Sequence, residues 1–223
     1  ILIKNKSINQ KKGRQLMNIF INRCFHWVSF HFIDQLLLQN YEVTGLREED
    51  NSLSDHLAMF FGRNSYFTEI NKINKRKSYD IAFIFENEEL INQIKAKKIF
   101  FITKQNKVVN KDVITIRLPL LFGEWMNMDE KGMYEAGNHI PFTSDKFKEE
   151  AIYIKPFIKL LQGWIEKTSL PKEVKLVTKH SEARKDEFSP NNICILIDNM
   201  HADVSKVISH YNSQKSFYEH WKQ

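Results

Sequence analysis

MNIFINRCFHWVSFHFIDQLLLQNYEVTGL, residues Met17–Leu46, is the stretch that decides the fold. An apolar run at 19–21 leads into a polar loop, and apolar residues between Trp27 and Leu37 then recur with helical spacing up to Asn40. The run YEVTGL at 41–46 is typical of a second buried strand. Because strand, loop, amphipathic helix and strand follow in this order, the stretch predicts one βαβ unit of a parallel sheet.

The rest of the chain repeats this alternation. We expect further strands at 79–85, 98–104, 112–123, 173–179 and 193–199, and helices at 51–63, 87–97, 150–168 and 201–222. The strands are almost continuously apolar, as in a sheet that is covered on both faces. The pattern predicts an α/β fold, a Rossmann-like doubly wound parallel sheet at 17–179 with a reduced C-terminal extension at 180–223. We expect a polar loop at 180–192 and a flexible segment at 126–139.

Positive charge is concentrated in the first 16 residues. They carry five Lys or Arg residues and no acid, so only +1 of the formal net charge of +6 belongs to residues 17–223. A nearly neutral body argues against nucleic acid as a partner. Residues 1–16 are either a disordered basic arm or untranslated in the cell, since KKGRQLM (11–17) can be encoded as a purine-rich ribosome-binding site before a start codon at Met17.

Cysteine content and hydropathy indicate in which cellular compartment the protein is expected. Cys24 and Cys194 imply no disulfide framework and fit a reducing environment. No apolar run approaches the roughly 20 residues of a membrane span. We therefore expect a cytoplasmic protein without a membrane partner. The histidines show no paired metal-ligand spacing, and we expect no metal site.

Several of these stretches resemble the extended short-chain dehydrogenases/reductases, the NAD-dependent epimerase/dehydratase family of nucleotide-sugar enzymes. Residues 19–47 are similar to the family's first βαβ unit, and YDIAFIF (79–85) and AKKIFFIT (96–103) to its fourth and fifth strands. VITIRLPLLFGEW (113–125) resembles the family's ILRxxxVYG strand and loop, and AIYIKPFIKLL (151–161) its VxVxDVAxAxxxAL segment. The resemblance covers most of 17–179 and implies NAD or NADP as the cofactor.

The loop that would bind the cofactor phosphates departs from the family pattern. The family's G-x-x-G-x-x-G falls on Arg23, His26 and Ser29, which makes these the candidate cofactor-binding positions. Arg47 stands where the family has an acid that holds the ribose, and an Arg there is compatible with the 2′-phosphate of NADP. Arg23 and His26 at a helix N-terminus either bind an anion or fill the space of a lost ligand.

The part of the chain that corresponds to the family's catalytic residues departs further from the family pattern. The resemblance implies a Ser or Thr after the fifth strand, for which Thr103 is the candidate, and then a helix with Tyr-x-x-x-Lys. Only 104–112 separate Thr103 from the next expected strand, and they contain no Tyr, so this helix is predicted to be deleted. A Tyr-x-x-x-Lys does occur at Tyr218–Lys222, where it is typical of a solvated terminal helix face.

Three further residues are candidates for the substrate side of the cleft. Tyr134 and His139 lie in the segment that leads towards this side in the family. Arg117 aligns with the Arg of the ILRxxxVYG pattern and is either a structural anchor or a ligand contact.

Together the departures predict a degenerate family member without NAD-dependent catalysis. We expect it to bind a nucleotide sugar or another anionic small molecule, or a protein partner such as a second copy or an active paralogue. The alternative is an active NAD(P)-dependent epimerase, dehydratase or reductase with an atypical cofactor loop.

Overall fold

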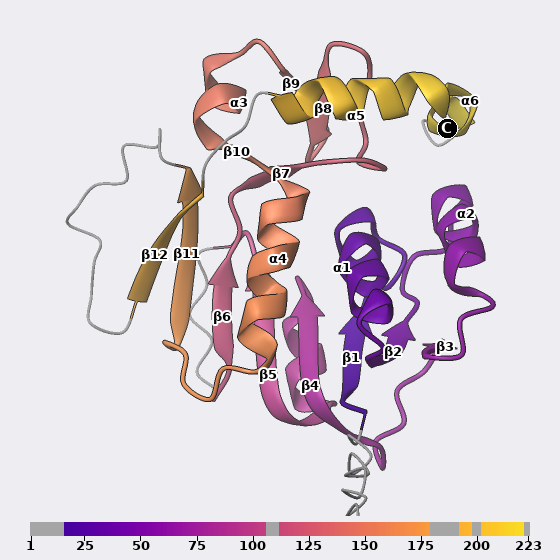
Figure 1. Cartoon of the computed structure of the whole chain (residues 1–223), viewed down its shortest axis with the longest axis vertical. Coiled ribbons are helices and arrows are strands. Elements are labelled where there is room, and N and C mark those ends of the chain that lie inside the picture. The colour runs from indigo at the N-terminus through magenta and orange to yellow at the C-terminus, as the bar shows by residue number, and fades with distance from the viewer. Residues whose placement is uncertain (1–15, 106–111, 179–191, 198–201, 221–223) are drawn as a thin grey trace, which may run out of the picture.

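The computed structural model describes residues 16–105, 112–178, 192–197 and 202–220, with the side chains of β12 left aside. Nearly all of the basic tail, most of the predicted polar loop and Lys222 lie outside this range. Among the described residues, eight strands form one parallel sheet in the order β12-β11-β6-β5-β4-β1-β2-β3 (Figure 1). The strands are β1 Asn18–Asn22, β2 Glu42–Leu46, β3 Phe67–Ile70, β4 Ser78–Phe85, β5 Lys95–Thr103, β6 Ile114–Arg117, β11 Glu173–Thr178 and β12 Asn192–Ile197.

The βαβ unit predicted from the opening stretch is confirmed. Helix α1 (Trp27–Leu38) joins β1 to β2, and the two strands pair in parallel from Asn18–Glu42 to Asn22–Leu46. The apolar face of α1 is buried against the sheet, with Phe32, Ile33 and Leu36 inaccessible to solvent. The predicted α/β fold with a parallel sheet is therefore correct.

The two faces of the sheet are covered unequally. Helices α1, α2 (Ser52–Phe61) and α4 (Ile154–Ile165) bury one face in the larger apolar cluster, and α1 and α4 lie side by side in front of the sheet (Figure 1). The smaller cluster on the other face contains alternate residues of the same strands and the short 3-10 helix η1 (Glu88–Asn92). Among the described residues, η1 is thus the helical element that packs against this second face.

Two helix boundaries follow from local chemistry that is visible in the sequence. The predicted cap Asn51 starts α2, because its side chain accepts a 2.9 Å hydrogen bond from the Ser54 N–H and the Ser54 hydroxyl accepts one from the Asn51 N–H. Pro156 lies in the first turn of α4, as predicted, where the missing proline N–H costs no hydrogen bond.

Three local predictions are wrong. The segment 87–97 is not a helix, since η1 ends at Asn92 and β5 already begins at Lys95. The segment 112–123 is two strands, because Pro119 interrupts it and β7 (Leu120–Phe122) leaves the main sheet to pair with β10 (Ala151–Tyr153). The segment 126–139 includes one strand of a hairpin, β8 (Gly132–Glu135) with β9 (Asn138–Pro141), rather than a flexible loop.

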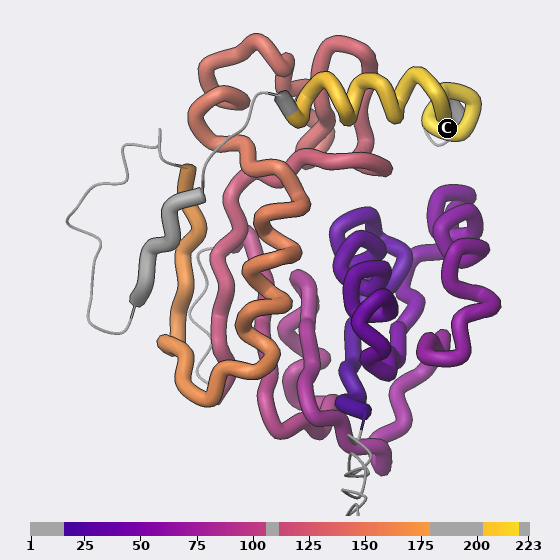
Figure 2. The backbone as a smooth tube through the Cα atoms, in the orientation of Figure 1, coloured from indigo at the N-terminus to yellow at the C-terminus, as the bar shows by residue number. Residues whose placement is uncertain are grey.

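The C-terminal helices cross the carboxyl end of the sheet. Helix α5 (Ala202–Ser213) and helix α6 (Lys215–His220) run over the top of α1 and α4, next to the β8–β9 hairpin and helix α3 (Asp145–Glu150) (Figures 1 and 2). The Trp125 N–H donates a 2.7 Å hydrogen bond to the Tyr218 hydroxyl and so ties α6 to the loop after β7. The sheet itself extends past residue 179, since β12 pairs with β11. Within the described ranges, no helix is long and apolar enough to cross a membrane.

Candidate functional site

The loop after β1 has the backbone shape of a phosphate-binding loop without its glycines. Arg23 adopts a φ of 50°, the left-handed conformation that the family's first glycine would take without strain. A non-glycine residue there costs about 1–2 kcal/mol. The adjacent Cys24 is buried against Gly45, whose added Cβ would lie 2.7 Å from the Cys24 Cβ. The buried Cys24 side chain therefore packs the loop closely against strand β2 of the sheet.

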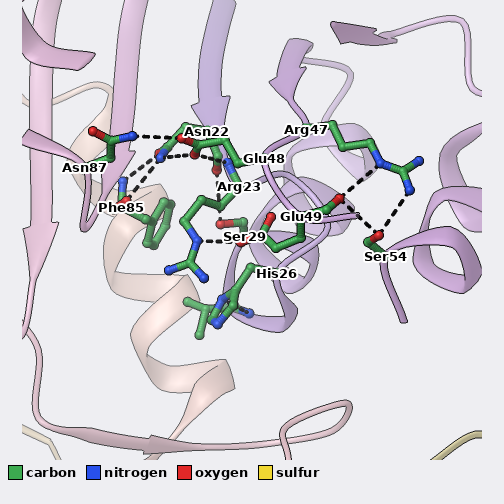
Figure 3. A network of polar contacts seen from close by, with 11 residues as sticks. Asn22, Arg23, His26, Ser29, Arg47, Glu48, Glu49, Ser54, Phe85 and Asn87 are labelled. Atoms are coloured by element: carbon green, nitrogen blue, oxygen red, sulfur yellow. Dashed lines mark hydrogen bonds and ion pairs between the residues drawn. The ribbon is translucent and has the colours of Figure 1, made fainter. Parts of the chain in front are cut away.

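The polar groups of this loop are satisfied by a carboxylate of the chain itself (Figure 3). Glu48 accepts hydrogen bonds from Asn22 Nδ2 at 2.6 Å, from the Arg23 backbone N–H at 3.1 Å and from Asn87 Nδ2 at 2.8 Å. Asn22 is completely buried and also bridges to β4, because its Oδ1 accepts from the Phe85 N–H at 2.7 Å. Glu48 thus supplies the negative charge that a ligand phosphate would bring to this backbone.

The two arginines expected at the cofactor site are engaged in ion pairs. The Arg23 Nε donates to Glu49 Oε1 at 2.5 Å. Arg47 points away from the loop towards α2, where its Nη2 donates to the Ser54 hydroxyl at 3.1 Å (Figure 3). The same Nη2 donates to Asp55 at 2.5 Å. The hydrogen bond to Asp55 raises the pKa of Arg47. Both guanidinium groups are thus paired with carboxylates of the chain, Arg23 through Nε and Arg47 through its Nη atoms.

His26 and Ser29 also serve the local structure. The His26 Nδ1 accepts from the Val28 N–H at 3.4 Å and so caps α1, and the Ser29 hydroxyl donates to the Asn22 carbonyl at 3.4 Å. Burial, together with the neighbouring Arg23, lowers the pKa of His26 to about 3. The imidazole is therefore neutral at physiological pH and adds no positive charge for an anion.

A cleft of about 770 Å³ opens where β1, β2 and β4 end, and its charge is negative. We call it the acidic cleft; its charged lining is Arg23, Glu48, Glu49, Glu86, Glu88 and Glu89. Five carboxylates thus face a single guanidinium. These glutamates were missed from the sequence, although the signal was visible as acids directly after the second strand and after the fourth.

Thr103, the candidate catalytic hydroxyl, is buried at the end of β5 and committed to a glutamate. Its Oγ1 donates to Glu86 Oε2 at 2.9 Å, and the Lys104 N–H donates to the other oxygen of the same carboxylate at 2.8 Å. Glu86 takes a left-handed φ of 58° to reach this position. The hydroxyl proton of Thr103 is therefore already donated within the chain.

The residues expected on the substrate side do not form one site. Tyr134 and His139 face each other across the β8–β9 hairpin and share Asp129, which lies 3.0 Å from the Tyr134 hydroxyl and 3.3 Å from His139 Nε2. Arg117 has separate partners in the sheet, since its Nε donates to Glu173 of β11 at 2.6 Å and its Nη1 to the Gln105 carbonyl. Of the two roles left open for Arg117, these contacts support the structural anchor.

A second cavity, of about 870 Å³, lies among α1, α2, α4 and α5. We call it the aromatic cavity; its ring side chains are Phe30, His31, His56, Phe60, Trp125 and His210. It shares no lining residue with the acidic cleft. For the part of the chain that the structure describes, no group of three or more His, Cys, Asp or Glu residues could hold a metal ion.

Comparison with known proteins places this geometry in a fold group. No protein-family model matches the chain, and no curated protein does. Among solved structures, it is similar to a dTDP-glucose 4,6-dehydratase from Bacillus anthracis in complex with NAD, at 8% identity and a TM-score of 0.57 over 91% of this chain and 99% of that one. It is likewise similar to the yeast methylglyoxal/isovaleraldehyde reductase Gre2 complexed with NADPH, at 9% identity and a TM-score of 0.57 over 90% of this chain and 100% of that one. An epimerase from Methanothermobacter thermautotrophicus matches at 7% identity and a TM-score of 0.57 over 92% of this chain and 94% of that one. The chain therefore has the Rossmann-like α/β fold of these dehydratase, reductase and epimerase structures.

Proposed function

We propose that the chain is a binding protein that keeps the fold of these enzymes without NAD(P)-dependent catalysis. One observation carries the proposal: the polar groups that would meet the cofactor and the substrate are bonded to the chain's own carboxylates. Glu48 accepts a hydrogen bond from the Arg23 backbone N–H, and Glu49 accepts one from the Arg23 guanidinium. Glu86 accepts one from the Thr103 hydroxyl.

Electrostatics opposes a dinucleotide in the acidic cleft. A pyrophosphate carries negative charge and would approach the loop amide that Glu48 now occupies. At about 4 Å, two like charges repel by roughly 1 kcal/mol in water and by about 4 kcal/mol near a protein surface. Displacing Glu48 would also leave the buried Asn22 amide short of one acceptor. Both terms lower the affinity for NAD and NADP.

The acid–base residues of the family also lack a counterpart. The sequence between β5 and β6 contains no Tyr, and we therefore propose that the Tyr-x-x-x-Lys helix of the family is missing from this chain. Tyr218, from the chance match at the C-terminus, is 2% exposed and accepts the Trp125 N–H. Burial raises the pKa of Tyr218, which is the opposite of what a tyrosine needs to act as a base at neutral pH.

The ligand class follows from the structural neighbours and is part of the proposal. The name of one neighbour contains dTDP-glucose, which supports a nucleotide sugar as a ligand without oxidation of the sugar. A second copy of the chain or an active enzyme of the same fold is the partner we propose in the absence of catalysis.

Isothermal titration of the full chain with NAD, NADP and dTDP-glucose tests the proposal. We expect no heat of binding for NAD or NADP up to about 1 mM, a level that bounds the binding free energy near −4 kcal/mol. Low-micromolar binding of either cofactor, together with turnover, would establish the active enzyme with an atypical loop instead. Binding of dTDP-glucose alone supports the ligand class.

A further inference from the structure

The aromatic cavity has the dimensions and lining of a small-molecule site. Its volume of about 870 Å³ falls in the range of about 300–1,000 Å³ that is usual for such sites. Its apolar lining includes Phe30 of α1, Ile158 of α4 and Trp125 of the loop after β7. Its polar lining includes Gln35, Lys159 and Gln214. A lining of apolar side chains with a few polar groups is the arrangement that binding pockets share.

Aromatic rings from separate elements converge on this cavity. Phe30 and Phe60 lie with their ring centroids 5.4 Å apart, and His56 lies 5.1 Å from Trp125. Trp125 is held further by His210 at 4.4 Å. Phe60, by contrast, is 56% exposed although it is a large apolar side chain beside the cavity. Its ring is therefore an exposed aromatic surface in the lining, of the kind that planar ligands contact.

The charges around the cavity balance. Burial lowers the pKa values of His31, His56 and His210, so these rings are neutral at physiological pH. The Lys155 ammonium lies 3.5 Å from the Glu124 carboxylate. Asp34 of α1 and Lys159 of α4 contribute one charge of each sign to the lining. A balanced lining favours a ligand without net charge.

Two buried polar atoms in the lining have unmet hydrogen-bonding capacity. Glu124 Oε1 accepts from the Tyr153 hydroxyl at 2.8 Å, whereas for Glu124 Oε2 no hydrogen-bond partner exists among the described residues, with His31 Nε2 at 3.9 Å beyond hydrogen-bond distance. Gln162 Nε2 on α4 lacks an acceptor in the same sense. Buried polar groups are otherwise almost always paired, so each of these points to a missing partner. The carboxylate needs a donor and the amide needs an acceptor.

We propose that the aromatic cavity binds an uncharged planar heterocycle of nucleobase size that carries both an N–H donor and a C=O or ring-nitrogen acceptor. The ring stacks on Phe60, its donor binds the Glu124 carboxylate and its acceptor binds the Gln162 amide. The Lys155 ammonium stays paired with the other carboxylate oxygen, Glu124 Oε1, at 3.5 Å, so the ligand donor meets Oε2 and the lining keeps its charge balance. This inference rests on the proposed function, because it names a site and a ligand class for a binding protein.

Titration of the full chain with uncharged nucleosides tests the inference. Adenosine, guanosine, cytidine and uridine are the probes, and benzene and indole are the apolar controls. We expect at least one nucleoside to bind in the micromolar range and both controls to bind at least tenfold more weakly. Phe60→Ala removes the stacking face and Gln162→Leu removes the amide at similar size, and each is expected to weaken nucleoside binding by about tenfold or more.

The matched control is Met59→Ala, which removes a neighbouring side chain of α2 that is 70% exposed and does not line the cavity. It should leave nucleoside binding unchanged, and circular dichroism checks that all variants are folded. Absence of binding by every nucleoside at about 1 mM overturns the inference, as does equal binding of benzene. Loss of binding in Glu48→Gln but not in Phe60→Ala places the ligand in the acidic cleft and also overturns it. The proposed function fails separately, through NAD or NADP binding with turnover.

Discussion

Replacing Glu48 by Ala tests whether this carboxylate is an internal substitute for a ligand anion. The residue lies on the surface, where most substitutions change the free energy of unfolding by less than about 0.5 kcal/mol. Glu48, however, accepts three hydrogen bonds, from Asn22, Arg23 and Asn87. Its loss leaves one N–H of the fully buried Asn22 amide without an acceptor, which costs about 1–3 kcal/mol.

The other two donors of Glu48 become open to water, so their loss adds only a few tenths of a kcal/mol each after allowance for solvent screening. We therefore expect Glu48→Ala to lower the free energy of unfolding by about 1.5–3 kcal/mol in urea titrations at pH 7. Glu48→Gln keeps an oxygen acceptor and should lose about 0.5–1 kcal/mol. The control Glu89→Ala removes another exposed acid of the acidic cleft and should stay within about 0.5 kcal/mol. Equal stability of Glu48→Ala and Glu89→Ala would refute the reasoning.

The other predictions concern the loop and the C-terminal helices. Below pH 6.5 the unfolded chain protonates His26 whereas the folded chain does not until about pH 3, so stability should fall as the pH drops through this window. When the pH is lowered from 7 to 4.5, the free energy of unfolding of the unaltered protein should fall by about 1–2 kcal/mol more than that of the His26→Asn variant, as measured by urea titration at both pH values. Equal losses in the two proteins would contradict this. Arg23→Gly with His26→Gly should not restore NAD binding in calorimetry, since Glu48 and Glu49 remain; restored binding would show that the loop alone is the block. Tyr218→Phe removes the acceptor of the Trp125 N–H and should cost about 1–3 kcal/mol by thermal unfolding, whereas an unchanged midpoint would mean that α6 is not held by this bond.

Periodicity was enough to predict the parts of the fold that local chemistry decides. The βαβ unit at 17–46, the cap at Asn51 and the first-turn Pro156 each depend on residues within a few positions of one another. The prediction of a helix at 87–97 was wrong because acids followed by lysines are compatible with two structures. They fit a helix, and they fit equally a short connection followed by the exposed start of a strand. Instead of forming a helical turn, Lys95, Ala96 and Lys98 pair with residues of β4.

The candidate site could be located from the sequence, but its chemistry could not. Alignment with the family motif pointed to Arg23, His26 and Ser29, and these do lie at the start of α1. What fills the site depends on contacts between distant positions, such as Arg23 with Glu49 and Thr103 with Glu86. No periodicity records such pairs, because an exposed acid after a strand looks the same whether it faces solvent or a backbone N–H.

The aromatic cavity was beyond sequence analysis for the same reason. Its lining combines α1 and α4, and the His31 imidazole contacts the Glu124 carbonyl at 3.0 Å across 93 positions of sequence. The aromatic residues of α1 are typical of a core-facing helix, and nothing in their spacing indicates that a cavity lies beside them.

A crystal structure of the full chain grown with excess NAD tests the central claim most directly. The account predicts that Glu48 still accepts from the Arg23 N–H and from Asn22 Nδ2, with no pyrophosphate at the start of α1. A pyrophosphate bound to the Arg23 N–H, with the Glu48 and Glu49 carboxylates turned out of the acidic cleft, would contradict the account.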